Sequence, residues 1–290
     1  MKAASTPRED IVIIVGVDGL RAGLEAVAWA AHEAVLRDVP LRVVYAVPAW
    51  CLDRGQAGPY SGVASWMRDG GHVALAEAVA AAQRAEPKVR VEPALVGDDP
   101  RLALIKESRE ADLLVVGDSG LGALRGKLVG SVAYGVAGHA VCDVVVVRKW
   151  RSPPRPEIVV GVDGSTAQPA VLEFAFKEAA LRGNDLRAVL AWDWHDLIRT
   201  DVLGTEPEAS RRTLAEALAG WQETYPDVRA STDVVQGHPV DALSHAAEGA
   251  DLLVVGSHGH GILTGMLLGS ISQAMMHHAP CPVGIVRITS

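Results

Sequence analysis

The sequence has few aromatic residues, few cysteines and no excess of basic residues, and each shortage excludes a class of protein. Aromatic residues make up 4% of the chain, so small aliphatic side chains such as alanine and valine must fill its core. Three cysteines are too few and too scattered for a disulfide framework. Lys and Arg together number 27 against 35 Asp and Glu, which leaves no basic field to attract nucleic acid or anionic lipid.

Long apolar runs are also missing. No run reaches the roughly 18 residues of a membrane-spanning helix, and the first ten residues lack the apolar core of a signal peptide. We therefore expect a cytoplasmic protein with neither a nucleic-acid nor a membrane partner. The 290 residues suit two domains, because a domain typically holds about 100 to 200 residues.

The chain contains an internal repeat. The segment Ala111–Arg148 aligns without a gap with Ala250–Arg287, and 20 of the 38 aligned positions are identical. Self-similarity at this level indicates a duplicated unit. We therefore predict domains at residues 9–148 and 157–288, joined at residues 149–156 by a short linker that three prolines stiffen.

Each copy is predicted to alternate strands with helices, because continuous β-branched runs are typical of strands buried on both faces. Strands are expected at 11–17, 41–47, 89–96, 113–116 and 144–147, and again at 158–162, 186–192, 228–236, 252–255 and 283–286. Helices are expected at 20–37, 73–85, 167–182 and 209–224 and from Pro100, Ser131, Pro239 and Ser270, with a loop over residues 50–71. The fold class is therefore α/β, with two tandem doubly wound, five-stranded parallel sheets of the Rossmann-like kind.

A glycine pattern follows the fourth strand of each copy. It consists of Gly117, Gly120, Gly130 and Ser131 in the first copy and of Gly256, Gly259, Gly269 and Ser270 in the second. Glycines let backbone N–H groups approach an anion without a Cβ, and a helix N-terminus adds unpaired N–H groups and a positive dipole end. The pattern predicts a phosphate site at the carboxyl ends of the strands, where doubly wound sheets bind ligands. The alternative is that these glycines only turn the chain from strand to helix.

Other motifs do not fit this stretch. Gly122–Lys127 has three residues instead of four between its glycines, and Leu128 stands where a P-loop has Ser or Thr. The dinucleotide spacing G-x-G-x-x-G fails in both copies, and Ser119 lacks the second spacer of G-x-S-x-G. His139 and Cys142, which recur in the second copy, are better explained by a helix end and a buried thiol than by a metal site.

The glycine spacing resembles the ATP-binding signature of the universal stress protein family in its tandem two-domain form, and the resemblance covers about Ile11–Arg287. It implies that ATP, alone or with Mg²⁺, binds in each copy. The triphosphate would lie on Gly117, Gly120, Gly130 and Ser131 in the first copy and on Gly256, Gly259, Gly269 and Ser270 in the second, and the cofactor site would also include Val132, His258 and Ile271. Asp18 and Asp163 would lie at the nucleoside, with Val47 and Trp192 beside the adenine.

The resemblance favours an ATP-binding regulatory protein of the stress response, since no general base or nucleophile is arranged beside the loops. We expect a homodimer that acts on a regulatory protein partner, whose identity the sequence leaves open. Two alternatives stay open. One is a slow ATP hydrolase or phosphotransferase that uses His258 or Asp118, and the other is a structural stress module whose loops no longer bind nucleotide.

The last strand of each copy is a β-branched run at the edge of its predicted sheet. An unpaired edge of this kind invites another strand. We therefore predict that the two copies pair edge to edge within the chain through these strands.

The two loops differ in charge. Asp118 in the first loop would repel phosphate unless Arg125 or Lys127 reaches the same phosphates. The second loop instead holds His258 and His260, and imidazoles gain protons between roughly pH 8 and pH 5. We expect the second copy to bind ATP more tightly as the pH falls and the first copy to be nearly insensitive. The alternative is that both imidazoles point to solvent.

Overall fold

The computed structural model describes residues 12–53, 60–118, 129–148, 155–163, 168–192, 207–258 and 268–288. The first half contains β1 (Ile13–Val17), α1 (Arg21–Arg37), β2 (Leu41–Val47), η1 (Ala49–Leu52), α2 (Ser61–Ala85), β3 (Val91–Gly97), α3 (Pro100–Glu107), β4 (Leu113–Gly117), α4 (Ser131–His139) and β5 (Asp143–Val147). The second half contains β6 (Arg155–Val162), α5 (Gln168–Arg182), β7 (Asp185–Trp192), α7 (Pro207–Thr224), β8 (Ala230–Gln236), α8 (Pro239–Ala246), β9 (Ala250–Gly256), α9 (Ser270–His278) and β10 (Val283–Val286). No helix within these described ranges is long and apolar enough to cross a membrane.

The ten strands form one sheet in the order β3-β2-β1-β4-β5-β10-β9-β6-β7-β8. All neighbours within each half are parallel. In each half the first strand lies between the second and the fourth, so the strand order reverses beside β1 and again beside β6. The predicted doubly wound, five-stranded parallel arrangement is confirmed in each half, and the two arrangements are joined into one sheet.

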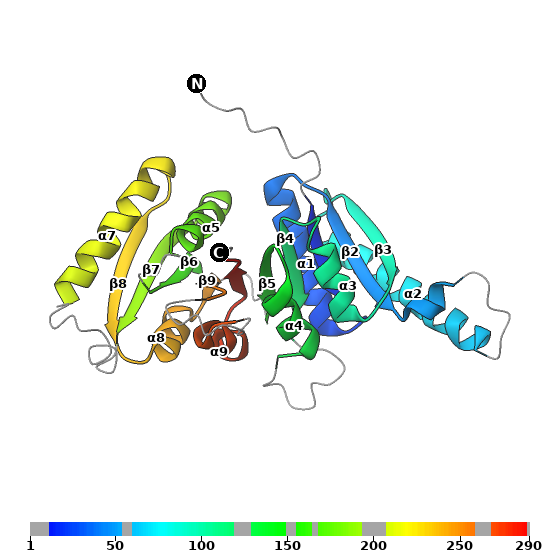
Figure 1. Cartoon of the computed structure of the whole chain (residues 1–290). Coiled ribbons are helices and arrows are strands. Elements are labelled where there is room, and N and C mark those ends of the chain that lie inside the picture. Colours follow the sequence, from blue (N-terminus) through cyan, green and yellow to red (C-terminus); the bar gives the residue numbers. More distant parts are fainter. Residues whose placement is uncertain are drawn as a thin grey trace, which may run out of the picture.

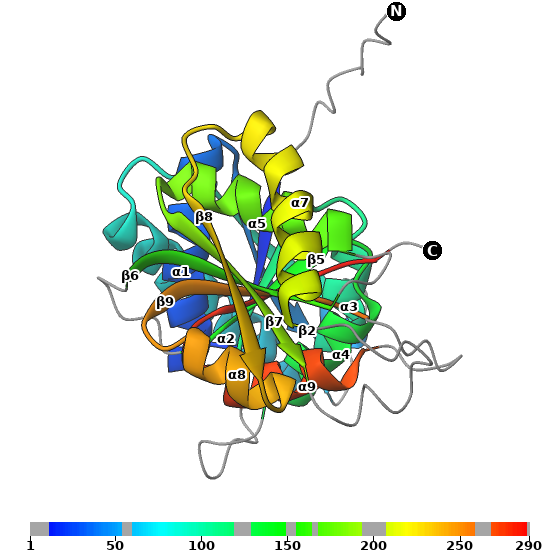
Figure 2. The same ribbon diagram turned by 90° about the vertical axis from the view of Figure 1, so that its left-hand side faces the viewer.

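Each half has helices on both faces of its sheet. Successive side chains of a strand point to opposite faces, so one strand contributes to two cores. Ile13 and Val15 of β1 belong to one core, and Ile14 belongs to the other. The first core lies beneath α1, α2, α5 and α7, and the second beneath α3, α4, α8 and α9 (Figure 1). Seen from the second half, α5 and α7 lie on one side of the strands, with α8 and α9 on the other (Figure 2).

The two halves join through their last strands. Strands β5 and β10 pair antiparallel, with Val144 opposite Ile285 and Val146 opposite Val283. All four side chains are buried, and Figure 1 shows green β5 beside the dark red C-terminal strand. The predicted edge-to-edge pairing is therefore confirmed, and each β-branched edge is covered by the other.

A buried cluster of four charges also holds the halves together. Glu33 and Arg37 of α1 bond to each other, and Glu178 and Arg182 of α5 do the same. Arg37 also bonds Glu178, and Arg182 bonds Glu33, so the four side chains close a ring. Both carboxylates are fully buried, and the arginine side chains are 8% and 4% exposed. Burial raises the pKa of Glu33, but the two guanidiniums outweigh burial and hold that pKa below its usual value.

The predicted loop over residues 50–71 is wrong, because most of this stretch is helical. Residues Ala49–Leu52 form η1, and α2 begins at Ser61, twelve residues before the expected start of 73. Gly71 serves packing rather than turning, because a Cβ on it would lie 2.7 Å from Leu95 Cδ1 of β3. Glycine therefore lets α2 lie close to the sheet.

The start of β6 also differs from the expected one. Strand β6 begins at Arg155, within the stretch 149–156 that the sequence predicts as a linker. Arg155 pairs with Ala250 of β9, and its N–H donates to the Gly249 carbonyl at 2.6 Å. These ladder contacts extend the strand beyond the β-branched run from which its start was predicted.

Candidate functional site

The candidate sites lie where the strand order reverses in each half. Strand β1 pairs with β2 on one side and with β4 on the other, and β6 is placed likewise between β7 and β9. Asp18 follows β1 directly, and Gly117 ends β4. Crevices at such reversal points are where doubly wound sheets bind ligands.

The same backbone arrangement connects strand to helix in both halves. The N–H of Gly130 donates to the Asp118 carbonyl at 2.8 Å, and the N–H of Gly269 donates to the Ser257 carbonyl at 2.7 Å. Each bond joins the end of a strand to the start of a helix. The structure therefore brings the end of β4, where Gly117 lies, to Gly130 and Ser131 at the start of α4.

The two helix starts offer donors for an anion. Gly130 and Gly269 occupy the N-cap positions of α4 and α9 and have no side chain with which to cap the first turn. The first N–H groups of a helix have no intrahelical acceptor, and the dipole makes this end positive. Ser131 and Ser270 are exposed beside these N–H groups. Val132 and Ile271, the next residues, are half-buried.

Gly117 and Gly256 differ in how closely their surroundings approach them. A Cβ on Gly117 would lie 2.7 Å from the Ala22 carbonyl oxygen of α1. A Cβ on Gly256 would lie 3.0 Å from the His258 carbonyl oxygen and 3.2 Å from Val171 Cγ2. Packing alone therefore requires glycine at Gly117, whatever ligand the loop binds.

Asp18 and Val47 are both engaged within the protein. The Asp18 carboxylate accepts a hydrogen bond from the Leu20 N–H at 3.0 Å, at the start of α1. Val47 is buried in a small cluster with Cys51 and Ala64, and its carbonyl accepts the Asp98 N–H at 2.8 Å. The Val47 side chain thus packs beneath α2, and its predicted place beside the adenine stays a prediction.

Four of the predicted site residues are described in part or not at all. Asp163 follows β6 and is exposed. Trp192 ends β7, where its backbone pairs with Gln236 of β8. Gly120 and Gly259 lie outside the described residues, and so do Arg125, Lys127 and His260.

Arg148 is a residue of the first site that sequence reasoning missed. Its Nε lies 3.3 Å from the Asp118 carboxylate, and the side chains are 18% and 25% exposed. Arg148 ends the repeat and follows β5. The repeat indicates this position of Arg148, but not that its side chain pairs with Asp118. In the second half Ser257 stands where the first has Asp118, and its hydroxyl accepts the Ile288 N–H at 3.2 Å.

Comparison with known proteins agrees with this geometry. The model of the Universal stress protein family matches the chain twice, over residues 12–148 and 155–287. The chain belongs to the universal stress protein family. A universal stress protein of Mycobacterium tuberculosis is 39% identical over 296 residues, covering 98% of this chain and 99% of the relative.

A solved structure of the family shares the fold over nearly the whole chain. A universal stress protein from Archaeoglobus fulgidus aligns with a TM-score of 0.74 at 18% identity, covering 96% of this chain and 99% of that one. A universal stress protein solved in complex with cAMP is 30% identical over 48% of this chain and 97% of its own, with a TM-score of 0.37. The tandem arrangement of two universal stress protein domains therefore extends over nearly the whole chain.

Residues among the histidines and cysteines that end each universal stress protein domain are bonded or buried within the protein. Burial raises the pKa of the Cys142 thiol, and likewise of Cys281, to about 12. The imidazole of His139 is bonded through Nδ1 to the Gly135 carbonyl at 2.8 Å. Within the described ranges, no group of three or more His, Cys, Asp or Glu residues could hold a metal ion.

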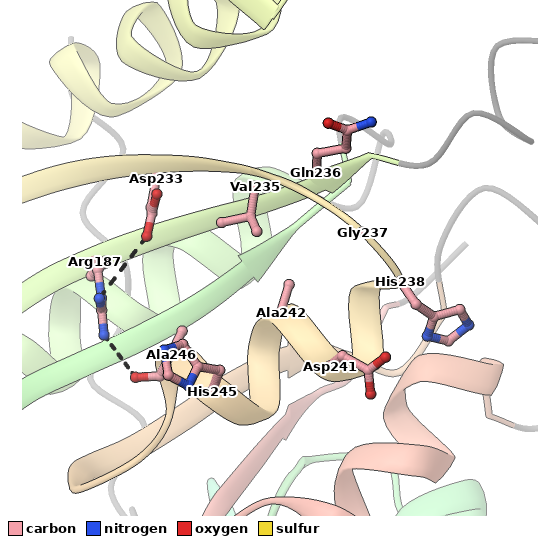
Figure 3. Close-up of a pocket in the computed structure, with 10 residues that line it drawn as sticks. All are labelled: Arg187, Asp233, Val235, Gln236, Gly237, His238, Asp241, Ala242, His245 and Ala246. Carbon is pink, nitrogen blue, oxygen red and sulfur yellow. Dashed lines mark hydrogen bonds and ion pairs between the residues drawn. The ribbon is translucent and has the colours of Figure 1, made fainter.

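A pocket of about 290 Å³ lies beneath α8 in the second domain, along β7 and β8 (Figure 3). Arg187 forms one end of it, bonded to the Ala246 carbonyl at 2.7 Å and to Glu157 at 3.1 Å. At the matching place in the first domain, Glu107 pairs with Arg42 at 3.2 Å. Ala246 replaces that glutamate, which accounts for the hollow. Because Glu157 already neutralises Arg187, the pocket does not indicate a charged ligand.

Proposed function

We propose that the chain is a regulatory stress protein that binds ATP in each of its two domains. The observation that carries this proposal is the repeated bond between strand end and helix start, from Gly130 to Asp118 and from Gly269 to Ser257. In each domain this bond sets a helix N-terminus beside the reversal of strand order. Two general features of anion and nucleotide sites therefore coincide twice in one chain.

The donor groups suit a triphosphate. In the first domain the N–H groups of the first turn of α4 and the exposed hydroxyl of Ser131 can donate to phosphate oxygens. Arg148 offsets the charge of Asp118 beside them. In the second domain Ser270 supplies the hydroxyl, and Ser257 adds no charge. The proposed nucleoside contacts remain Asp18, Asp163, Val47 and Trp192. The proposed phosphate contacts include Gly120 and Gly259, and ATP binds alone or with Mg²⁺.

A regulatory role is favoured over hydrolysis because the candidate catalytic groups are engaged elsewhere. Asp118 is ion-paired with Arg148. His258 lies 3.1 Å from the Ser257 hydroxyl, which resembles a base beside a nucleophile. The Ser257 side chain is fully buried, however, and its oxygen accepts a backbone N–H, so it cannot reach a phosphate.

Direct binding measurements test the proposal. Gly130 and Gly269 have extended backbone angles that any residue can adopt, so Gly130→Val and Gly269→Val should fold while covering the helix N–H groups. Calorimetry with ATP should find two sites in the wild type, one in each single variant and none in the double variant. A wild-type protein that binds no ATP and releases no nucleotide on denaturation would refute the proposal. Turnover lost in His258→Asn with binding retained would favour the hydrolase instead.

We further propose a cytoplasmic homodimer, with its apolar contact on α2. The N-terminal part of α2 projects beyond the sheet (Figure 1), and its Trp66 and the preceding Tyr60 are 75% and 67% exposed. Two aromatic side chains of about 150–250 Å² each would supply the apolar centre of an interface that needs about 800 Å² per partner. Gly62 and Gly70, one turn to either side of Trp66, have open space where a Cβ would be. A second copy could therefore place its own tryptophan there, as a twofold contact requires.

The dimer contact can be tested by mass in solution. Trp66→Lys should convert a dimer into a monomer in light scattering, because a charge would then lie at the apolar centre. Val141→Lys, at an exposed apolar residue outside α2, is the matched control and should leave the mass unchanged. A Trp66→Lys protein with the same mass as the wild type would contradict the proposed surface.

A further inference from the structure

The two helices that carry the proposed phosphate sites are each bonded at their other end by an arginine from the opposite domain. Arg148 Nη1 donates to the Met276 carbonyl of α9 at 3.0 Å, and Arg287 Nη1 donates to the Gly138 carbonyl of α4 at 3.0 Å. Carbonyl groups at a helix C-terminus lack intrahelical donors, and a cation there stabilises the helix dipole. Each helix of nine residues, about 14 Å long, thus joins a proposed site to the other domain.

The two arginines differ in what else they contact. Arg148 is also paired with the Asp118 carboxylate, whose backbone forms part of the first site. Arg287 follows β10. In its domain the residue that corresponds to Asp118 is the uncharged Ser257. A second contact runs in the same direction as Arg148: the Val129 N–H, just before Gly130, donates to His277 Nδ1 of α9 at 3.3 Å. The first site therefore contacts α9 through both its carboxylate and its helix start.

We propose that Arg148 couples the two nucleotide sites, so that an anion bound in the first domain weakens binding in the second. This inference rests on the proposed ATP binding. Phosphate near Asp118 repels the carboxylate and attracts the guanidinium, because the three charges are then close together. Arg148 is drawn toward the first loop, and its bond to the Met276 carbonyl weakens. Helix α9 loses its C-terminal partner, and its N-terminal site binds less tightly.

The expected coupling is modest. One hydrogen bond to a helix terminus changes an equilibrium by about two- to tenfold. By linkage, ATP in the second domain weakens binding in the first by the same factor. Arg148 acts here as a positioning residue, because it reaches the second site only through α9.

Calorimetry of variants with one site blocked measures this coupling. In Gly130→Val only the second site should bind ATP. Its affinity should be about two- to tenfold higher than the affinity of the second site in the wild type when the first site is occupied. Arg148→Met should abolish this difference. Arg287→Met is the matched control: it removes the α4 contact and should leave the coupling through Asp118 in place. An undiminished coupling in Arg148→Met would overturn the inference.

Hydrogen exchange tests the same path without nucleotide. Asp118→Asn removes the ion pair that fixes the Arg148 guanidinium beside the Met276 carbonyl. Amides at residues 275–279 of α9 should therefore exchange about two- to tenfold faster, while those of α4 stay unchanged. If no ATP binds, the proposed function fails, and the path through Arg148 is judged by this exchange alone. Unchanged exchange at α9 in Asp118→Asn would overturn the path even if both domains bind ATP.

Discussion

The two domains share their backbone frame and differ in the charges placed on it. At the end of the fourth strand of each domain, Asp118 and Ser257 make matching bonds: each donates its N–H to the end of the last strand, at 3.0 and 2.8 Å. Their side chains then diverge, since Asp118 pairs with Arg148 whereas Ser257 lies beside His258. The two copies therefore share the backbone hydrogen bonds of the sheet, and they differ in the charged side chains at each site.

Beneath the third helix of each domain the same comparison shows how a charge can move between elements. Arg42 is paired with Glu107 of α3, whereas Arg187 is paired with Glu157 of β6. The carboxylate has moved from the helix to the strand, and the guanidinium has a partner in both domains. The difference leaves a pocket in the second domain that is explained by packing.

Breaking the charge ring between the domains should have the largest effect. Glu33→Ala and Glu178→Ala each leave two buried guanidiniums short of a carboxylate, and such losses cost about 3–5 kcal/mol. Each glutamate is bonded to both arginines, so both variants should be destabilised in urea unfolding. Glu25→Ala, which breaks the exposed pair with Arg21, should cost at most about 1 kcal/mol. A ring variant no less stable than Glu25→Ala would contradict the assignment.

Glu33 should also make stability depend on acid, whereas burial and the neighbouring Glu33 raise the pKa of Glu178. The folded-state pKa of Glu33 is lowered, so its contribution is complete above the unfolded value of about 4.3 and is lost as the pH falls through the lowered value. Urea midpoints from pH 6 to pH 3 should fall more steeply in the wild type than in Glu33→Ala. Parallel curves would show that Glu33 is not the group responsible.

Equivalent glycines of the two domains should differ in what a methyl group costs. Gly117→Ala places its Cβ against the backbone of Ala22, which cannot move aside, and should cost about 1–3 kcal/mol. Gly256→Ala meets a more distant carbonyl, at 3.0 Å, and the Val171 Cγ2 at 3.2 Å, so it should cost less. Urea unfolding of the two variants compares them directly. Equal costs would show that α1 is not packed as tightly as described.

The relocated carboxylate predicts a double-mutant cycle. Ala246→Glu alone adds a carboxylate beside Glu157, and Glu157→Val alone leaves Arg187 short of a partner. The two changes together rebuild the arrangement of Arg42 and Glu107 and should be less destabilising than the sum of the single changes, by about 0.5–3 kcal/mol. Additive effects in urea unfolding would mean that Glu107 does not correspond to Glu157 in function.

How far the sequence predicts this molecule depends on the kind of signal. The β-branched runs predict the strands and their parallel order, and the repeat predicts two domains joined at their edges. The start of α2 was missed because Gly70 and Gly71 are typical of loops. Gly71 is instead required because α2 packs closely against Leu95 of β3. A glycine needed for a long-range contact cannot be told locally from a glycine that turns the chain.

The same limit applies to the sites. The glycine spacing predicts which strand end meets which helix start, because both are fixed by local structure. Arg148 and the charge ring depend on contacts between residues far apart in the chain. A signal for the ring existed, since Glu33 and Arg37 recur as Glu178 and Arg182 at the same spacing within the repeat. Charged pairs repeated at positions where a helix faces the sheet are therefore worth examining.

The smallest expected effect concerns pH and the second site. His258 directly follows Ser257, and its Nδ1 lies 3.1 Å from the Ser257 hydroxyl, which fixes the ring beside the start of the loop. An imidazole gains a proton between about pH 8 and pH 5, and a protonated ring near phosphate is attracted to it. The attraction of such a partly exposed pair is at most about 1 kcal/mol, or about fivefold in affinity. The first site has the ion pair of Asp118 and Arg148 at this place instead of a histidine.

ATP affinity measured from pH 8 to pH 6 in the two single-site variants separates these expectations. With the first site blocked by Gly130→Val, binding should tighten as the pH falls, and His258→Asn in the same background should remove most of that change. With the second site blocked by Gly269→Val, affinity should stay nearly constant. A pH dependence that survives His258→Asn would assign the effect to another group, such as His260 or the phosphate itself, while leaving the two backbone sites as proposed. A dependence in the first site instead would reverse the comparison, since the ion pair of Asp118 and Arg148 would then fail to shield that site from titration.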